Sequence, residues 1–387
     1  MKPLGLYIHI PFCLRKCNYC DFLSFSGRSR EDHAAYTDAL LAELEYYADR
    51  NSLLDSIYIG GGTPSLLDSD LISRVMQRIF SRFTVSETAE ITIEANPGLL
   101  DRDKLTAYRN AGINRLSIGA QSLNDQILSL LGRAHDRDGF IRNFATARDC
   151  GFENISVDLM FAIPQQTQDI WMDTLDKTIA LGPEHISFYS LQIEETTPFY
   201  ELWMRGEMEP IEDHVDRIMY HSAIERLKNS GYRHYEISNA AKPGYESRHN
   251  LKYWSMEEYL GVGLGAHSYM NGKRFSNEAD LGKYIRISAE GSCAGSQYGS
   301  GPWTIWCHEN TVEDEMSEFL FTGLRKVEGV LLSAFEERFA LPLTAIYGDS
   351  VRKHSENGLL EMDEEADRLR LTAKGMDLFN QVLVDFV

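Results

Sequence analysis

The chain has 387 residues, of which 43% are hydrophobic and 25% are charged, a composition typical of globular proteins with a large buried core. Its 38 Lys and Arg against 58 Asp and Glu leave a net charge of −20, which argues against binding to nucleic acid or to an anionic membrane surface. No stretch approaches the ~18 apolar residues of an integral membrane segment, and residues 1–11 are too lightly charged for a signal peptide, so we expect a cytoplasmic protein.

Apolar runs with strand character alternate with stretches of helical periodicity over residues 1–200. The predicted strands are Leu4–Ile10, Ser56–Ile59, Glu90–Ala95, Arg115–Gly119, Ile155–Phe161 and His185–Gln192. The predicted helices between them are Asp32–Asp49, Ser69–Phe83, Arg102–Ala111, Asp136–Gly151 and Thr167–Leu181. Runs as continuously apolar as Ile155–Phe161 suit parallel strands covered by helices. The pattern predicts an α/β fold, and it suits a partial (β/α)6 barrel and a flat doubly wound sheet equally well.

The middle of the chain is predicted to extend this first domain and then to become a linker. Residues 201–287 contain a predicted helix over Glu212–Ser230 and a predicted strand over His234–Ser238. Residues 288–310 begin with a stretch that is small and polar, rich in Gly and Ser, as in flexible linkers.

The tail, residues 311–387, is predicted to form a separate α+β domain. Helical patterning is followed by two short strands, at Gly358–Glu361 and Leu369–Thr372, which flank an acidic turn. This arrangement resembles a winged helix. Because the tail is acidic, we expect it to pack on the rest of the protein or to act as a lid rather than to bind DNA.

Half of the six cysteines are clustered in one short segment directly after the first predicted strand. They form a C-x3-C-x2-C motif: Cys13, Cys17 and Cys20. Three thiolates in one loop can ligate three irons of a [4Fe–4S] cluster and leave the fourth iron open to a non-protein ligand. Zinc or unligated thiols are the alternatives, but zinc needs a fourth ligand, and no Cys or His occurs in the ten residues after Cys20. The remaining cysteines are scattered: Cys150, Cys293 and Cys307.

Glycines and polar residues lie at or near the ends of the next four predicted strands. In chain order they are the loop Gly60–Pro64, Glu94, Gln121, Arg133 and Asp158. The carboxyl ends of parallel strands meet at one edge of a barrel, where such folds place their active sites. A charged residue is unusual in a strand as apolar as the one around Asp158, and the position of the whole set at successive strand ends favours a functional role over a structural one. We therefore expect a ligand site at this edge.

Together these motifs resemble those of the radical S-adenosylmethionine enzymes, and more closely those of the oxygen-independent coproporphyrinogen III oxidase (HemN) family. The matching segments are Tyr7–Cys13, Gly60–Pro64, Glu94–Pro97, Gly119–Ser122, Leu131–His135 and Val157–Met160. The resemblance covers essentially the whole chain. It implies a partial (β/α)6 radical S-adenosylmethionine barrel followed by a C-terminal, winged-helix-like domain.

The resemblance also implies roles for individual residues. The motif cysteines would ligate the [4Fe–4S] cluster, and the amine and carboxylate of S-adenosylmethionine would chelate its fourth iron. The positions that match contacts to this cofactor are Tyr7, Tyr19, Gly61, Gly62, Thr63 and Glu94. Those that match contacts to a second S-adenosylmethionine in the oxidase are Gln121, Arg133 and Asp158. An electron donor such as a flavodoxin would reduce the cluster, which then splits the cofactor to a 5′-deoxyadenosyl radical.

Three features resemble the haem-chaperone branch of this family, HemW, rather than the oxidases. Phe22 stands where the oxidases have a further cysteine, and only twelve residues precede Cys13, in place of a long N-terminal arm. The segment His249–Trp254 matches the H-N-x-x-Y-W stretch of that branch. An imidazole beside two aromatic rings can supply an axial haem ligand and a wall for the porphyrin. We therefore predict haem binding, with His249 as a contact, and transfer of the haem to an unidentified acceptor protein.

Two other functions remain possible from the sequence. The main alternative is an oxidase that decarboxylates the propionates of coproporphyrinogen III by hydrogen abstraction. A regulatory cluster sensor that binds DNA through its tail is disfavoured by the net charge of −20.

The segment Gly261–Gly265 lacks the strand–helix context of a dinucleotide-binding motif. We expect it to pack near the cofactor. His267 is then either a cofactor contact or a core histidine.

Overall fold

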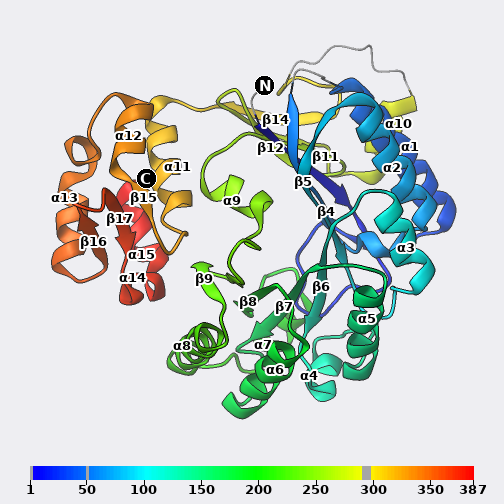
Figure 1. The fold of residues 1–387 in the computed structure, drawn as a ribbon, viewed down its shortest axis with the longest axis horizontal. Helices are drawn as coiled ribbons and strands as arrows, with labels where there is room; N and C mark the ends of the chain where they lie inside the picture. Colours follow the sequence, from blue (N-terminus) through cyan, green and yellow to red (C-terminus); the bar gives the residue numbers. More distant parts are fainter. Residues whose placement is uncertain (1–2, 49–51, 290–297) are drawn as a thin grey trace.

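The computed structural model describes residues 3–48, 52–289 and 298–387, and a curved sheet dominates it (Figure 1). Six parallel strands form the middle of this sheet, in chain order: β1 (Pro3–Ile10), β4 (Leu53–Gly61), β5 (Thr84–Ala95), β6 (Arg115–Gln121), β7 (Asn154–Phe161) and β8 (His185–Ser190). The helices that follow the strands cover the outer face: α1 (Arg30–Tyr46), α2 (Ser69–Arg82), α3 (Arg102–Asn110), α5 (Arg137–Asp149) and α6 (Gln168–Leu181).

The order of these strands decides between the two predicted architectures. A doubly wound sheet reverses its strand order at a switch point and carries helices on both faces. Here neighbouring strands are consecutive from β1 to β8, and the helices lie on one face (Figure 1). The prediction of a partial (β/α)6 barrel is therefore confirmed, the flat doubly wound alternative is wrong, and each of the six predicted strands overlaps one of these six.

Alternation along the strands separates the core from the site. In β1, the side chains of Leu6, Ile8 and Ile10 are fully buried in the core cluster beneath the helices. Successive side chains point to opposite faces of a strand, so Tyr7 and His9 project from the other, concave face. The concave face is consequently the surface on which polar strand residues can meet.

The middle of the chain extends both edges of this sheet. After α7 (Pro198–Met204) and α8 (Asp213–Asn229), two antiparallel strands join the edge at β8: β10 (Asn239–Ala241) and β9 (Arg233–Glu236). Helix α9 (Arg248–Trp254) then lies on the concave side (Figure 1). Beyond it, β11 (Tyr259–Val262) pairs in parallel with β1, and three antiparallel strands follow: β12 (His267–Met270), β13 (Lys273–Asn277) and β14 (Thr304–Glu309).

Part of the predicted linker joins the large sheet. Residues 290–297, including Cys293, lie outside the described residues. Thr304–Glu309 forms β14, which pairs with β13, and the preceding Trp303 is fully buried in the core. Helix α10 (Leu281–Ala289) precedes this stretch and contacts α1.

The C-terminal residues form a smaller unit with its own core. Its elements are α11 (Val312–Gly323), β15 (Val330–Leu331), α12 (Leu332–Phe339), α13 (Leu343–Glu356), β16 (Leu360–Asp363), β17 (Arg368–Leu371), α14 (Ala373–Asp377) and α15 (Phe379–Leu383). The two predicted strands correspond to β16 and β17, which pair in a three-stranded sheet with β15. Leu320, Phe335 and Leu369 are fully buried in its core.

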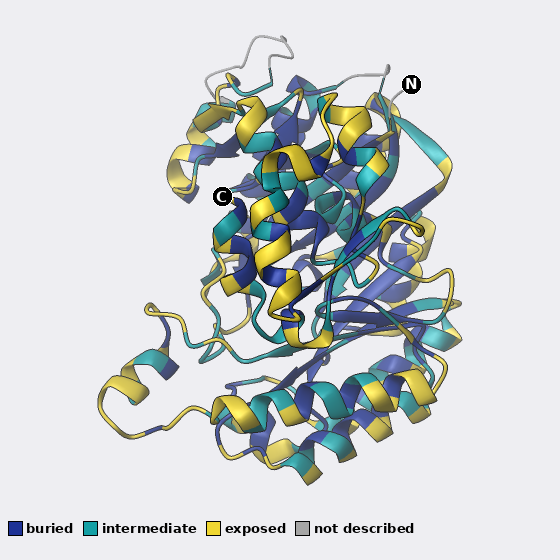
Figure 2. Ribbon diagram, turned by 90° about the vertical axis from the view of Figure 1, so that its left-hand side faces the viewer, coloured by how far each residue is buried: buried dark blue, intermediate teal, exposed yellow. Residues whose placement is uncertain are grey.

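Side-chain and backbone contacts join this unit to the large sheet, and two of them lie at different strands. The guanidinium of Arg274 on β13 forms a bidentate ion pair with the carboxylate of Glu318 on α11, at 2.6 and 2.8 Å. Glu236 on β9 pairs with Lys326 in an isolated backbone bridge. Buried positions concentrate in the strands and exposed ones on the outer sides of helices (Figure 2). Among the described residues, no helix has the length and apolar character that crossing a membrane requires.

Candidate active site

The cysteine motif occupies the loop that follows β1. Cys13 ends the short strand β2 (Phe12–Cys13), which pairs with β3 (Phe25–Ser26) and so closes the loop at its base. Cys13 is buried, and Cys17 and Cys20 are partly buried; all three thiols are free of disulfides. No three metal-binding side chains among the described residues converge on a single ion. A [4Fe–4S] cluster does not need three ligands to meet at one ion, because each thiolate binds a different iron.

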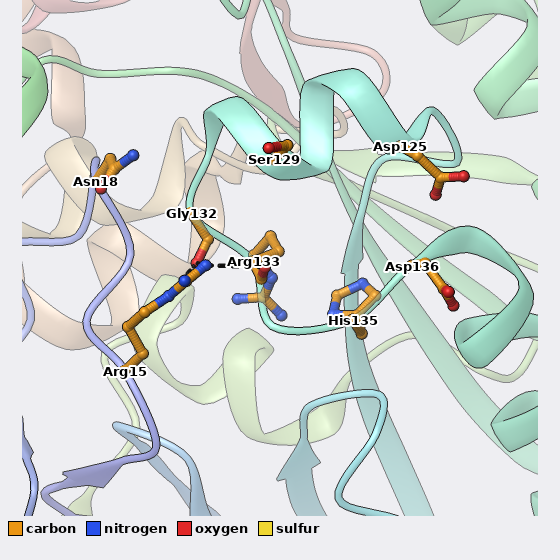
Figure 3. A pocket seen from close by; sticks show the side chains of 8 residues that line it. All are labelled: Arg15, Asn18, Asp125, Ser129, Gly132, Arg133, His135 and Asp136. Atoms are coloured by element: carbon orange, nitrogen blue, oxygen red, sulfur yellow. Dashed lines mark hydrogen bonds between the residues drawn. The ribbon is translucent and has the colours of Figure 1, made fainter.

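The loop after β6 fixes the cysteine loop from outside. Asn18 donates its backbone N–H to the carbonyl of Leu131 at 3.0 Å. The Arg15 guanidinium donates to the carbonyl of Gly132 at 2.9 Å and to that of Arg133 at 3.0 Å. Figure 3 shows Arg15 and Asn18 facing these residues across a polar surface pocket of about 440 Å³.

Two predicted site residues contact the thiols directly. The Thr63 hydroxyl lies 3.5 Å from the sulfur of Cys13, and the Arg133 guanidinium donates to the sulfur of Cys17 at 3.4 Å. Tyr19 lies close enough to Cys17 and Arg133 for their charges to act on it, although burial is the main cause of its raised pKa. Burial also raises the pKa of the Cys20 thiol to about 11. A bound iron would offset this cost of burying a charged thiolate, because metal ligands bind in the deprotonated form and the iron neutralises the charge.

The glycine loop after β4 packs tightly against β1 and β2. Gly61 has a φ of +111°, and a Cβ there would lie 2.6 Å from the His9 ring. A Cβ on Gly62 would lie 2.8 Å from the carbonyl oxygen of Phe12. Only glycine therefore fits at these positions, and the bare backbone allows a ligand to approach closely.

Glu94, at the end of β5, is a partly buried carboxylate in this region. It accepts hydrogen bonds from the Tyr58 hydroxyl at 2.9 Å and from the backbone N–H of Gly61 at 3.0 Å. Burial raises its pKa to about 7, and the negative charge of Asp158 adds to the shift. Glu94 can therefore change its charge near neutral pH and accept a hydrogen bond from a ligand when ionised.

Tyr7 and His9 form a hydrogen-bonded chain along β1. The Tyr7 hydroxyl donates to Nδ1 of His9 at 2.9 Å, and Nε2 of His9 donates to the carbonyl of Leu23 at 2.9 Å. The Tyr7 ring also stacks on Tyr58, with ring centroids 6.4 Å apart. Tyr7 is thereby placed beside the pair formed by Tyr58 and Glu94.

The remaining predicted residues lie on β6, on β7 and in the loop after β6. Asp158 accepts hydrogen bonds from Ser117 at 3.1 Å and from Ser156 at 3.3 Å. Gln121 has a φ of +65° and accepts a hydrogen bond from the Tyr189 hydroxyl at 2.9 Å. A side-chain-bearing residue in this backbone region is strained, as is common at functional sites.

His249 is a buried residue of α9. Its backbone N–H donates to Glu90, and its ring nitrogens are hydrogen-bonded to the hydroxyls of Ser56 at 2.9 Å and Tyr253 at 2.8 Å. The ring stacks on Tyr58 and is 1% exposed, and burial lowers its pKa to about 3. His249 is thus neutral at pH 7, and its use as a metal ligand would first require one of these bonds to break.

Several contacts in the site were not predicted. Asn96 links Thr63 to Arg133: its amide donates to the Thr63 hydroxyl at 3.0 Å and accepts from Arg133 at 2.7 Å. Arg115 is 2% exposed within β6, and its charge acts on Glu94 and His249. Arg115 could have been found by the pattern that pointed to Asp158, because it too is a charged residue within an apolar strand.

Comparisons with known proteins agree on one relationship. The chain matches the model of the Radical SAM superfamily over residues 7–178 and that of the HemN C-terminal domain over residues 310–378. "Heme chaperone HemW" of Bacillus subtilis is 37% identical over 384 residues, which cover 98% of each chain. The protein of the same name from Lactococcus lactis is 33% identical over 388 residues, which cover 100% of this chain and 98% of the relative.

The solved structure of coproporphyrinogen III oxidase (HemN) from Escherichia coli, a radical SAM enzyme, superposes with a TM-score of 0.84 at 25% sequence identity. The match covers 100% of this chain and 90% of that one. The similarity therefore includes both the sheet and the C-terminal unit.

Proposed function

The chain belongs to the HemW family within the radical S-adenosylmethionine proteins, and from this membership we propose that it is a haem chaperone. It binds haem and transfers it to an acceptor protein. Membership of the superfamily implies a [4Fe–4S] cluster and S-adenosylmethionine as cofactors. We place this function in the cytoplasm, with a flavodoxin-like protein as the electron donor.

The residues of the cysteine loop and the glycine loop fit these two cofactors. Cys13, Cys17 and Cys20 would supply three thiolates, and S-adenosylmethionine would chelate the fourth iron. The glycine loop after β4 presents bare backbone there, because a Cβ on Gly61 or Gly62 would clash with the His9 ring or the Phe12 carbonyl. Around it lie the side chains proposed to contact this cofactor: Tyr7, Tyr19, Thr63 and Glu94. When bound and reduced, the cluster supplies one electron to the sulfonium of S-adenosylmethionine.

We extend the proposal to Gln121, Arg133 and Asp158 as contacts of a second S-adenosylmethionine. All three come from β6, from β7 or from the loop after β6, beside the first cofactor site. Arg133 already donates to Asn96 and to the carbonyl of Gly119. We therefore expect Gln121 and Asp158 to make the hydrogen bonds to this second ligand.

One observation carries the haem-binding proposal. Tyr253 and Trp254, the aromatic pair of the H-N-x-x-Y-W stretch, line the same cavity of about 600 Å³ as Tyr7 and His9. The segment that resembles the chaperone branch thus adjoins the proposed cofactor site through a shared space. His249 would act there by fixing the hydroxyl of Tyr253.

The oxidase is the second candidate, because the structural match to HemN covers the entire chain. At the position of the further oxidase cysteine, Phe22 is 63% exposed and cannot ligate metal. This difference favours the chaperone.

Both activities can be measured on one anaerobically reconstituted sample. Haem is titrated spectroscopically, and coproporphyrinogen III is then supplied with S-adenosylmethionine and an electron source. We expect stoichiometric haem binding and no release of carbon dioxide. Release of carbon dioxide would establish the oxidase instead, and absence of both activities would leave only the family assignment standing.

A further inference from the structure

The cavity that Tyr253 and Trp254 line is bounded by both parts of the molecule. It lies between β11, β12 and β13 of the large sheet and α11 of the C-terminal unit, beside α9 (Figure 1). Its volume of about 600 Å³ is in the ~300–1,000 Å³ range of cofactor pockets. Six Tyr, Trp and Phe rings contribute to its lining: Tyr7, Tyr253, Trp254, Tyr259, Tyr269 and Phe321. Such a lining suits a flat, largely apolar macrocycle.

Contacts with neighbouring side chains hold the aromatic rings of the lining in place. The Tyr253 hydroxyl is bonded to His249, and its ring packs edge-on against Tyr259, with centroids 4.6 Å apart. The Arg325 guanidinium covers the Trp254 ring at 4.3 Å. The Tyr269 hydroxyl donates to Glu315 at 2.9 Å. The cavity is therefore shaped in advance of any ligand.

Besides four tyrosines, whose hydroxyls are already hydrogen-bonded, the lining has three side chains with atoms that ligate haem iron: His9, Met256 and His267. Both ring nitrogens of His9 are already bonded, to Tyr7 and to Leu23. Met256 is 5% exposed and belongs to the wall. His267, at the start of β12, is exposed, and its ring makes no hydrogen bond to any other described residue. His267 is thus the imidazole that is free to meet a ligand in this cavity.

The surroundings of His267 also favour the form that binds iron. Partial burial lowers its pKa, and the positive charge of Arg274 lowers it further. The imidazole is therefore neutral at pH 7, with a lone pair available for a metal. Arg274 is itself held away by its ion pair with Glu318 and its hydrogen bond to Tyr259 at 3.3 Å.

We propose that haem binds in this cavity with His267 as an axial ligand, and that His249 is a positioning residue for Tyr253. This inference rests on the haem-binding function proposed above. It replaces the expectation that the imidazole of the H-N-x-x-Y-W stretch itself binds iron. A single exposed ligand also suits a protein that must give its haem to an acceptor.

The test is an anaerobic titration of haemin into the reconstituted protein, followed through the Soret band. The variants are His267→Ala, His267→Cys, His249→Phe and, as a control, His308→Ala. His308 is an exposed histidine of β14 outside the cavity lining, paired with Asp314 at 3.0 Å. Because His267 is also exposed, we expect its replacement to leave the fold intact, which circular dichroism and the iron content of each variant will check.

We expect His267→Ala to shift the Soret maximum and to weaken haem affinity about 10-fold or more. His267→Cys should give a third Soret position, because a thiolate replaces the imidazole; a purely structural role would not produce this signature. His249→Phe and His308→Ala should keep the wild-type position. If the wild type binds haem and His267→Ala binds it identically, or if only His249→Phe shifts the band, the assignment of His267 is wrong although haem binding stands. If the wild type binds no haem, the proposed function fails together with this inference.

Discussion

The guanidinium of Arg133 donates a hydrogen bond to the sulfur of Cys17 at 3.4 Å while Asn96 and the carbonyl of Gly119 hold the same group at 2.7 and 2.6 Å. The contact joins a residue of the loop after β6 to a proposed cluster ligand 116 positions earlier in the chain. A fixed positive charge beside a thiolate stabilises an iron–sulfur cluster most in its reduced, more negative state. Arg133 is therefore placed to raise the reduction potential of the cluster.

Replacement of Arg133 by Met should make the cluster harder to reduce. We expect the midpoint potential to fall by on the order of tens of millivolts, because both a charge and a hydrogen bond to sulfur are lost. A redox titration followed by electron paramagnetic resonance measures this. Arg137→Met, which removes an exposed guanidinium paired with Asp138, is the control. Equal potentials in all three proteins, at equal iron content, would show that Arg133 does not act on the cluster.

Cluster content should depend on the motif cysteines and not on the others. Reconstituted wild type should contain about four irons and four sulfides, and Cys17→Ser should lose most of both. Cys150→Ser is the matched control, because Cys150 is a partly buried thiol at the end of α5. Iron and sulfide assays decide the matter. A comparable loss in the two variants would contradict the proposed ligand set.

Binding of S-adenosylmethionine should follow the ionisation of Glu94. Its pKa is raised to about 7 by burial, so the carboxylate that accepts a ligand hydroxyl forms as the pH rises through 7. We expect tighter binding at pH 8 than at pH 6. Glu94→Gln should weaken binding by about 1–3 kcal/mol, roughly 5- to 150-fold, and abolish this pH dependence. Equilibrium dialysis at the two pH values gives the answer, and unchanged affinity would place Glu94 outside the site.

The same ionisation should cost folding stability in the absence of the ligand. A carboxyl whose pKa is higher in the folded than in the unfolded state loses stability as the pH rises from its ordinary value of 4.5 through 7. Glu94→Gln should therefore raise the unfolding temperature of the ligand-free protein at pH 8 although it weakens binding. A variant that binds the ligand more weakly but unfolds at a higher temperature cannot owe its weaker binding to general damage to the fold.

His249 should make the fold sensitive to acid. Burial lowers its pKa to about 3, so the stability gained from the neutral ring is complete above its ordinary value of 6.5 and is lost as the pH falls from 6.5 towards 3. At pH 5 this loss is about 2 kcal/mol. His249→Phe keeps a ring against Tyr58 but cannot ionise, so its stability should change less than that of the wild type between pH 7 and pH 5. Denaturant unfolding at both pH values tests this, with His308→Ala as the control; parallel losses in wild type and His249→Phe would refute it.

Local patterns were sufficient for the central strands but not for the edges of the sheet. The six parallel strands lie in the sheet in the same order as in the sequence. Each apolar run therefore pairs with the next one along the chain, and local patterns are enough to predict the pairing. The pairing of Tyr7 with Gly261 joins β1 to β11 across most of the chain, and no local pattern specifies such a pairing. For the same reason the sequence predicted a helix and a strand in residues 201–287 without predicting that this region extends both edges of the sheet, through β9 and β10 on one side and β11 to β13 on the other.

The candidate site was predicted where its residues are unusual in their surroundings. Glu94 and Asp158 are carboxylates in apolar strands, and three cysteines in one loop are rare. Tyr58 gave no such signal, because tyrosine is common in strands, yet its hydroxyl holds Glu94. The cavity beside His267 could not be predicted, since its walls come from β11 to β13, α9 and α11 and meet only in the folded protein.

Gly61 offers a test of whether the close packing of the glycine loop against His9 is needed for cofactor binding. Alanine there would be strained by the φ of +111°, and its Cβ would lie 2.6 Å from the His9 ring, which must then move and release Tyr7. Gly151→Ala is a matched control, because Gly151 has a φ of +84° with no atom within 4 Å of the added Cβ. Backbone strain of about 1–3 kcal/mol should lower the unfolding temperature of both variants. Only Gly61→Ala should also lose affinity for S-adenosylmethionine, measured by equilibrium dialysis on folded protein with a full cluster, and equal affinity in the two variants would show that cofactor binding does not depend on the packing of Gly61 against His9.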